Sequence, residues 1–131
     1  MPTIFSRIIQ GEIPCYKVAE DADHIAFLDI QPVARGHVLV VPKVEVDYIF
    51  DLDAEAYSSL WNFAGKVAHG LKKALPCQRI GIAVIGLEVP HAHIHLVPLQ
   101  TMDDINFSST RHSLSAEDLE ELRKQISGCM G

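Results

Sequence analysis

Three histidines at alternating positions are the most reactive feature of the sequence. His91, His93 and His95 are separated by the apolar residues Ala92 and Ile94. Successive side chains of an extended strand point to opposite faces, so the three imidazoles share one face and the apolar side chains share the other. Imidazole titrates near neutral pH and acts as nucleophile, general acid or base, or metal ligand. The spacing therefore predicts a functional site on one face of a strand whose other face packs into a core.

Two other interpretations of the histidine run are open from spacing alone. One is decoration of a solvated edge, which strict alternation with apolar residues makes the weaker interpretation. The other is a metal-binding protein that uses the same face, because two histidines at positions i and i+2 of a strand reach one zinc ion. The residues available as further ligands show no recognisable ligand spacing: His24, His37, His69, His112, Cys15, Cys77 and Cys129. We expect no metal and no cofactor.

The composition restricts the class of partner. A chain of 131 residues, 48% of them hydrophobic, is long enough for one domain with a buried core. The net charge of -6 offers no basic surface for a nucleic acid backbone or an anionic membrane, so we expect a small ligand. The longest apolar run, 80–87, is too short to cross a bilayer. Unpaired cysteine spacing and an N-terminus without signal-peptide features favour a cytoplasmic protein.

The hydrophobic pattern predicts a single α+β domain. Apolar runs bounded by turn residues indicate five strands, the fourth of them a buried strand. Residues that can cap helices precede three segments with apolar side chains at three- and four-residue steps. Strands paired by short turns, with helices against one face, give an antiparallel sheet. The expected strands are 16–20, 25–29, 37–42, 79–86 and 91–99, and the expected helices follow Thr3, Asp53 and Ser115, with ends near Gly11, Pro76 and Ile126.

Residues 91–97 and two other segments resemble the histidine triad (HIT) family. The family signature is His-φ-His-φ-His-φ-φ, where φ is apolar, and residues 91–97 satisfy it at every position. The segment 3–14 resembles the start of the Hint-like branch of this family, and residues 26–43 resemble its nucleotide-binding strand pair. The resemblance implies one HIT-like domain over residues 1–131, with a core at about 3–99 and an extension at 100–131. It also implies a five-stranded meander sheet and a homodimer formed through the long helix and the sheet edge.

The resemblance implies nucleotidyl transfer to a histidine. In HIT hydrolases the middle histidine, here His93, attacks the α-phosphorus of a nucleoside phosphoramidate or a dinucleoside polyphosphate, and water then releases the nucleotide. His91 and His95 are expected to hydrogen-bond phosphate oxygens on either side. The expected ligand is a purine nucleotide or a nucleoside phosphoramidate. A nucleotide-binding module with weak or lost catalysis is the alternative.

The resemblance further implies a nucleotide pocket beside the histidines. Asp29 is expected to accept hydrogen bonds from the 2′ and 3′ hydroxyls of a ribose. Apolar residues are expected to line the pocket, with ordinary core packing as the alternative for the three from the N-terminal helix. The residues expected there are Ile4, Phe5, Ile8, Leu28 and Ile30.

The sequence departs from the Hint-like pattern near the expected phosphates. Leu87 stands where that branch usually has glutamine, Glu88 stands for a hydroxyl residue, and Glu45 stands for a histidine. A carboxylate about 4 Å from a phosphate oxygen would cost on the order of 4 kcal/mol at an effective dielectric of 20. We therefore expect Glu88 to turn away from the phosphate or to pair with a triad histidine, with His91 as the slightly favoured partner.

Overall fold

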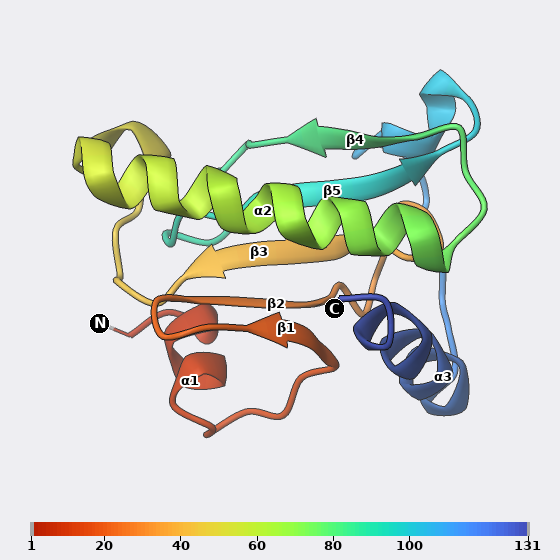
Figure 1. Ribbon diagram of the computed structural model, residues 1–131, viewed down its shortest axis with the longest axis horizontal. Coiled ribbons are helices and arrows are strands. Elements are labelled where there is room, and N and C mark those ends of the chain that lie inside the picture. The colour runs from red at the N-terminus through yellow and green to blue at the C-terminus, as the bar shows by residue number, and fades with distance from the viewer. Residues whose placement is uncertain (1, 131) are drawn as a thin grey trace.

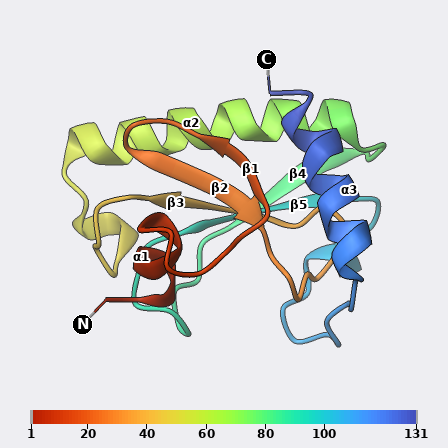
Figure 2. The same ribbon diagram turned by 90° about the horizontal axis from the view of Figure 1, so that it is seen from below.

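A five-stranded antiparallel sheet with helices on both faces forms the protein. The structure is a computed structural model that describes residues 2–130. Figure 1 shows α2 lying lengthwise across one face of the sheet, and Figure 2 shows α1 and the loop after β5 on the opposite face. The α+β architecture predicted from the sequence is confirmed, but the expectation of helices on one face only is wrong, because α1 packs on the face opposite α2 and α3. The elements are α1 (Ile4–Ile9), β1 (Lys17–Glu20), β2 (His24–Leu28), β3 (Val38–Pro42), η1 (Ile49–Asp51), α2 (Ala54–Ala74), β4 (Arg79–Ala83), β5 (Ile94–Leu99), η2 (Met102–Ile105) and α3 (Ala116–Ser127).

The order of the strands differs in one place from a simple meander. Neighbouring strands follow the order β1-β2-β3-β5-β4, so β5 lies between β3 and β4. The helix α2 carries the chain from β3 to the far edge of the sheet, and β5 then fills the gap. The expectation of a buried fourth strand is wrong, because β4 is an edge strand paired on one side only and Ile82 is 51% exposed. The histidine-bearing strand is the buried one.

The inner strands alternate between two apolar layers. On one face Ile94 packs with Leu60 of α2 in the main core. On the other face Leu39 packs with Phe5 of α1 in a smaller cluster. His95 lies directly opposite Leu39 in the β3–β5 register, so its side chain is on the α1 face. The period-two pattern of the sequence thus separates histidines from core as expected.

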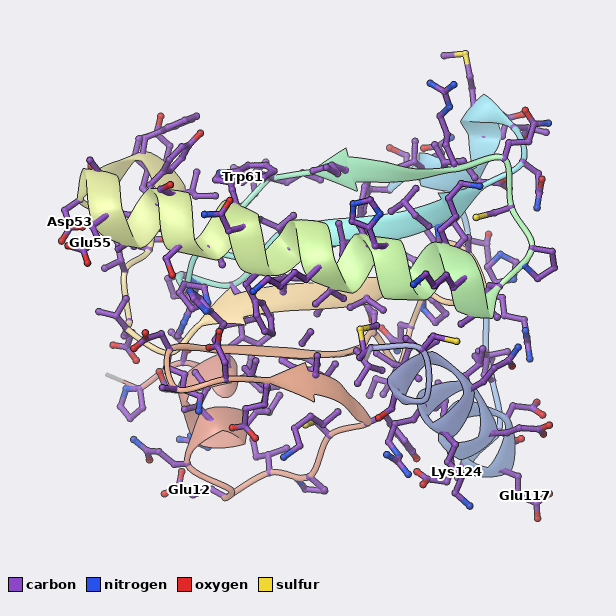
Figure 3. All side chains as sticks on the ribbon, viewed as in Figure 1. Glu12, Asp53, Glu55, Trp61, Glu117 and Lys124 are labelled. Atoms are coloured by element: carbon purple, nitrogen blue, oxygen red, sulfur yellow. The ribbon has the colours of Figure 1, made fainter. Side chains whose placement is uncertain are left out.

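The helix α2 begins and ends where its capping residues predict. The Asp53 side chain accepts a hydrogen bond from the Ala56 N–H at 2.8 Å. The helix ends at Ala74, two residues before Pro76, which cannot continue it. Figure 3 shows Trp61 along the edge of α2 toward β4. Its Nε1–H is the one buried side-chain polar atom of residues 2–130 that has no hydrogen-bond partner.

The helix α3 makes the C-terminal extension part of the domain. Ser115 caps it by accepting a hydrogen bond from the Asp118 N–H at 3.1 Å. Leu119, Leu122 and Ile126 are buried in the main core together with residues of α2. Within residues 2–130, the structure contains no helix long and apolar enough to span a bilayer.

A tight turn at Gly36 delivers the chain into β3 next to the histidines. Its φ of +91° lies in the region that favours glycine, and a Cβ there would overlap the Leu75 side chain and lie 3.1 Å from Pro98 Cγ. Gly65, in contrast, is an exposed position inside α2 where a Cβ would meet no atom within 4 Å.

Substitution of these two glycines by alanine is expected to change stability in opposite directions. Gly36→Ala should lower the free energy of unfolding by about 1–3 kcal/mol, because the residue is strained and the core is overfilled. Gly65→Ala should raise it by about 0.5–1 kcal/mol through helix propensity. Urea unfolding monitored by circular dichroism measures both. A Gly36→Ala protein as stable as the wild type would contradict the strained turn.

Candidate functional site

The three histidines lie close together at the beginning of β5, on the sheet face that carries α1. Only His95 is within the strand, and His91 and His93 are in the segment just before it. All three side chains are buried, and the His93 and His95 rings meet edge to face with centroids 4.8 Å apart. Because β5 is an inner strand, hydrogen bonds to both neighbours hold His95 in place.

The hydrogen bond of His93 fixes which of its nitrogens carries the proton. Its Nδ1 lies 2.7 Å from the carbonyl oxygen of His91, and a carbonyl only accepts. In the neutral ring the proton is therefore on Nδ1, and Nε2 keeps its lone pair. Burial lowers the pKa of His93, and the hydrogen bond to the His91 carbonyl opposes that shift. The ring is thus neutral at pH 7, with a lone pair on Nε2.

A second chain of hydrogen bonds fixes the proton of His95. The Val33 N–H donates to His37 Nδ1 at 3.1 Å, so the proton of neutral His37 is on Nε2. That Nε2–H donates to His95 Nδ1 at 2.9 Å, which leaves the His95 proton on Nε2. Burial lowers the pKa of His37 to about 3 and that of His95 to about 4, so both rings are neutral at pH 7. His95 therefore presents a hydrogen-bond donor.

The free nitrogens of His93 and His95 are both accessible to a ligand. No residue among 2–130 forms a hydrogen bond with Nε2 of either ring. Trp61 Nε1 is the one side-chain polar atom in that range that is both inaccessible and without a partner, so the two histidine Nε2 atoms are accessible. A lone pair on His93 and an N–H on His95 are therefore left for a ligand, on rings whose centroids are 4.8 Å apart. Such a pair can attack an electrophilic phosphorus and bind one of its oxygens.

His91 occupies a different position from the one expected. Its Nε2–H donates to the Pro42 carbonyl oxygen at 2.8 Å, and its Nδ1 accepts from the Thr3 hydroxyl at 2.9 Å. The side chain is fully buried, so neither nitrogen is left for a phosphate oxygen. The expected phosphate contact of His91 is therefore wrong, because the protein itself uses both nitrogens. The geometry assigns His91 to positioning, since its carbonyl orients His93.

Asp29 lies at the end of β2 with one oxygen free. Its Oδ1 accepts from the Gln31 N–H at 2.8 Å, and its Oδ2 lies 3.8 Å from His37 Nδ1 and 3.9 Å from Arg111 Nη1. Burial raises the pKa of this carboxyl, and the Gln31 N–H and the Arg111 charge oppose that shift. The Oδ2 atom is thus available to accept a hydrogen bond from a ligand.

The apolar residues expected around a nucleotide separate into two groups. Phe5 is buried with its ring centroid 4.9 Å from that of His93, and Ile8 packs in the same cluster. Ile4 and Ile30 are exposed. Leu28 points into the main core under α2, so its expected place in a nucleotide pocket is wrong. The cause is strand alternation, which turns the preceding residue, Phe27, to the site face instead.

The residues that depart from the Hint-like pattern do not pair with the triad. Glu88 is exposed and forms no ion pair within 4.0 Å with any residue of 2–130, so the expected pairing with His91 is wrong. His91 already has two partners. The Glu88 charge is nevertheless near enough to raise the pKa values of His93 and Asp29, although burial dominates both shifts. Leu87 is 88% exposed and offers no polar contact.

Glu45 has a structural function at the first turn of α1. Its Oε1 accepts hydrogen bonds from the Thr3 N–H at 3.2 Å and from the Ser6 hydroxyl. Thr3 in turn caps α1 by accepting from the Ser6 N–H at 3.0 Å and donates to His91. The replacement of a histidine by Glu45 therefore connects α1 to the triad through Thr3.

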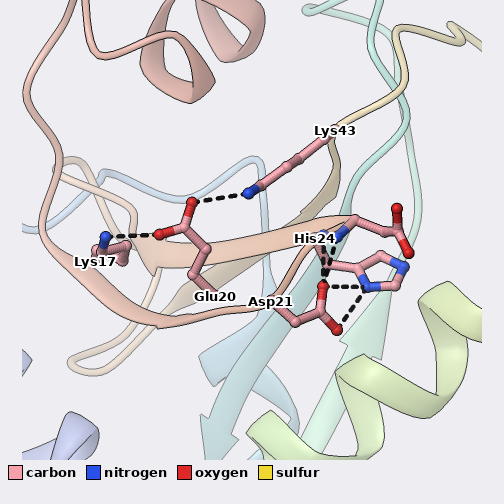
Figure 4. Close-up of polar contacts among 6 residues, drawn as sticks. Lys17, Glu20, Asp21, His24 and Lys43 are labelled. Carbon is pink, nitrogen blue, oxygen red and sulfur yellow. Dashed lines mark hydrogen bonds and ion pairs between the residues drawn. The ribbon is translucent and has the colours of Figure 1, made fainter.

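Two other polar side chains near the sheet, those of Lys43 and His24, are engaged elsewhere. Figure 4 shows Lys43 beside Glu20, with Nζ 2.9 Å from Oε2, so its charge is paired away from the triad. The same view shows His24 bound to Asp21, with Nδ1 2.9 Å from Oδ1. Within residues 2–130, no group of three or more His, Cys, Asp or Glu side chains is arranged to hold a metal ion.

Besides Phe27, three residues of the site were not predicted from the sequence. His37 orients His95, and its position after the Gly36 turn and opposite the histidine strand is a signal that could have revealed it. Phe107 lies with its ring centroid 4.8 Å from that of His95, and the Arg111 guanidinium carbon is 5.4 Å above the Phe107 ring. No sequence spacing links these two residues to the triad, because tertiary packing alone places the loop that carries them.

Comparison with known proteins gives consistent matches. A family model described as the HIT domain matches residues 10–102. The adenosine 5′-monophosphoramidase of Schizosaccharomyces pombe is 32% identical over 130 residues, which cover 97% of each chain. A crystal structure of a HIT-like protein from Bartonella henselae, described as involved in cell-cycle regulation, has a TM-score of 0.84 and 32% identity, covering 97% of this chain and 95% of that one. A zinc-bound histidine triad family protein from Mycobacterium smegmatis has a TM-score of 0.83 and 26% identity, with coverages of 97% and 91%.

The two depressed histidine pKa values predict a loss of stability in acid. Below the unfolded value of about 6.5, the imidazoles of His37 and His95 take up protons in the unfolded chain but not in the folded one until about pH 3 and about pH 4. The free energy of unfolding should therefore fall as the pH drops from 6.5 toward 4. In His37→Asn the slope should be shallower by up to about 1.4 kcal/mol per pH unit, the value for one proton. Urea unfolding at a series of pH values measures it, and an unchanged slope would show that His37 is not held neutral.

Proposed function

Because the chain belongs to the HIT family, we propose that it is a nucleotide-binding hydrolase that attacks the α-phosphate of its substrate with His93. The observation that carries this proposal is the fixed proton on His93 Nδ1, which leaves Nε2 accessible beside the N–H of His95. The similarity to the adenosine 5′-monophosphoramidase of S. pombe supports a nucleoside phosphoramidate, with a purine base, as the substrate class. A dinucleoside polyphosphate presents the same α-phosphorus.

The proposed reaction has two steps at one nitrogen. The lone pair of His93 Nε2 forms a bond to the α-phosphorus as the bond to the leaving nitrogen breaks, and the nitrogen takes a proton from solvent water and departs as the amine, which gives a nucleotidyl-histidine. The ring then carries a positive charge, and the His91 carbonyl, 2.7 Å from Nδ1, stabilises it. In the second step a water oxygen forms a bond to the phosphorus as the phosphorus–nitrogen bond breaks, and a proton of that water passes to solvent, which releases the nucleotide and restores neutral His93. The Nε2–H of His95 donates to a phosphoryl oxygen as its charge grows.

The nucleoside is proposed to lie between Asp29 and α1. The free Oδ2 of Asp29 accepts from the ribose hydroxyls, while Phe5 and Ile8 contribute apolar surface toward the base. Phe5 also contacts both His91 and His93 edge to face, so base binding and the position of the nucleophile share one side chain.

A nucleotide-binding module without turnover is the second candidate. The observation that favours it is the negative charge of Glu88 near His93 and Asp29, at a place where the Hint-like branch has a hydroxyl group. Such a charge repels an anionic transition state and weakens catalysis more readily than it removes the binding of the nucleoside.

The three free cysteines agree with a reducing compartment, and we place the activity in the cytoplasm.

Trapping the covalent intermediate separates the two candidates. Adenosine 5′-phosphoramidate labelled on phosphorus should leave label on the wild-type protein after acid-free denaturation, and His93→Ala should carry none. Turnover in that variant should fall by about 10³-fold or more, since the nucleophile is removed. His69→Ala, which changes an exposed histidine of α2, is the control and should label normally. Label on His93→Ala would overturn the assignment, and binding without turnover in the wild type would establish the second candidate.

We further propose that two copies associate through β4 and the adjacent edge of α2. The unpaired edge of β4 and the segment after it expose apolar side chains, which a second copy would cover. The exposed apolar residues are Ile82, Val84, Ile85 and Leu87.

Light scattering tests this assembly. The wild type should have about twice the chain mass of 14.5 kDa at micromolar concentration. Ile82→Glu should halve that mass, because a charge is then buried in the apolar contact. Val44→Glu, at an equally exposed position outside this surface, is the matched control and should leave the mass unchanged. A wild-type mass of 14.5 kDa, or no effect of Ile82→Glu, would rule the interface out.

A further inference from the structure

The histidines of the site carry no positive charge. Burial lowers the pKa values of His37, His93 and His95, so these rings are neutral at pH 7. Asp29 and Glu88 add negative charge nearby. The phosphate of a nucleotide is itself anionic, and an anion next to uncompensated carboxylates is repelled. A nucleotide site of this composition therefore needs a cation from another part of the chain.

Arg111 lies where such a cation is needed. Its Nη1 is 3.9 Å from Asp29 Oδ2 and donates to the Gln31 carbonyl oxygen at 3.0 Å. Among the lysines and arginines of residues 2–130, it is the one whose charge shifts the pKa values of Asp29, His37 and His95 together. Its side chain is 30% exposed. The guanidinium has five N–H groups, so donors remain for a ligand.

The loop that carries Arg111 is fixed to the site face of the sheet. Phe107 packs with Val33, Ala34 and Val97, and Val97 lies on the same strand face as His95. Figure 2 shows this loop below the sheet, on the same side as α1. The guanidinium rests above the Phe107 ring, which limits its freedom before a ligand arrives.

A backbone hydrogen bond next to Arg111 also holds this loop. The His112 N–H donates to the Pro32 carbonyl oxygen at 2.9 Å, directly after Arg111. The segment between Gln31 and Val33 thus receives hydrogen bonds from two consecutive residues of the C-terminal loop. It also contains the N–H groups that bind Asp29 and His37, so the loop, the acid and the histidine relay share one rigid support.

We propose that Arg111 binds the phosphate of the nucleotide and supplies the counter-charge that Leu87 and Glu88 do not. The inference rests on the proposed function and deepens it, because it assigns the anionic half of the ligand to a residue outside the HIT signature. The ion pair with Asp29 is long, at 3.9 Å, and contains no hydrogen bond, so Arg111 can turn to a phosphate oxygen while Asp29 accepts ribose hydroxyls. The site then selects nucleotides over nucleosides.

Calorimetric titration with AMP and with adenosine tests this assignment. Arg111→Ala should weaken AMP binding by about ten- to hundredfold, the loss of a charge-assisted contact, while adenosine binding changes less than about threefold. Arg111→Lys should recover part of the AMP affinity, because it restores the charge without the fork geometry. Asp29→Ala should weaken both ligands by similar factors. Arg123→Ala, which removes the same charge from α3 where it pairs with Glu120, is the matched control and should bind like the wild type.

Each other result overturns a defined part of the inference. Equal losses for AMP and adenosine in Arg111→Ala would show that the residue only positions Asp29. Tighter adenosine binding in that variant would show that Arg111 competes for the Asp29 carboxylate. Unchanged AMP binding would remove Arg111 from the site and leave the proposed function standing. A wild-type protein that binds neither ligand would overturn the proposed function and this inference together.

Discussion

A buried neutral imidazole has one donor and one acceptor, and each partner that the protein supplies decides which nitrogen is which. This constraint runs through the whole site. The Val33 N–H places the proton of His37 on Nε2, and that N–H in turn places the proton of His95 on its Nε2. The His91 carbonyl places the proton of His93 on Nδ1. Each of the two chains of hydrogen bonds begins at a backbone group, which can only donate or only accept. The sheet therefore determines the proton positions, and burial ensures that they persist at neutral pH.

The same constraint explains why the first residues of the chain matter to a site near its end. The Thr3 hydroxyl donates to His91 and accepts the capping hydrogen bond from the Ser6 N–H. Glu45 accepts hydrogen bonds from the Thr3 N–H and the Ser6 hydroxyl. His91 then holds the Pro42 carbonyl oxygen at the end of β3. One side chain thus joins α1 to the sheet, and His93, the proposed nucleophile, follows two residues later.

Much of this arrangement could be predicted from local patterns. Alternation in residues 91–97 separated the histidines from the core, and Thr3, Asp53 and Ser115 marked the beginnings of the three helices. These features depend on neighbours in sequence. The same reasoning could not predict that His91 is saturated by Thr3 and Pro42, since those partners are remote in the chain. Leu28 was wrongly expected in the nucleotide pocket because the resemblance covers a whole strand segment, whereas alternate residues of that strand point to opposite faces of the sheet.

The loop between β5 and α3 is held in place differently from the rest of the site. It is tied to the Gln31–Val33 segment at one end and to a helix buried in the main core at the other, yet it contributes no strand to the sheet. The histidine relay closes without it. With the proposed role of Arg111, the histidine relay and the recognition of charge reside in separable parts of the chain, one positioned by the sheet and the other by a surface segment. Exchange of residues 100–115 between relatives would then transplant ligand preference while the proton positions stay where the sheet has put them.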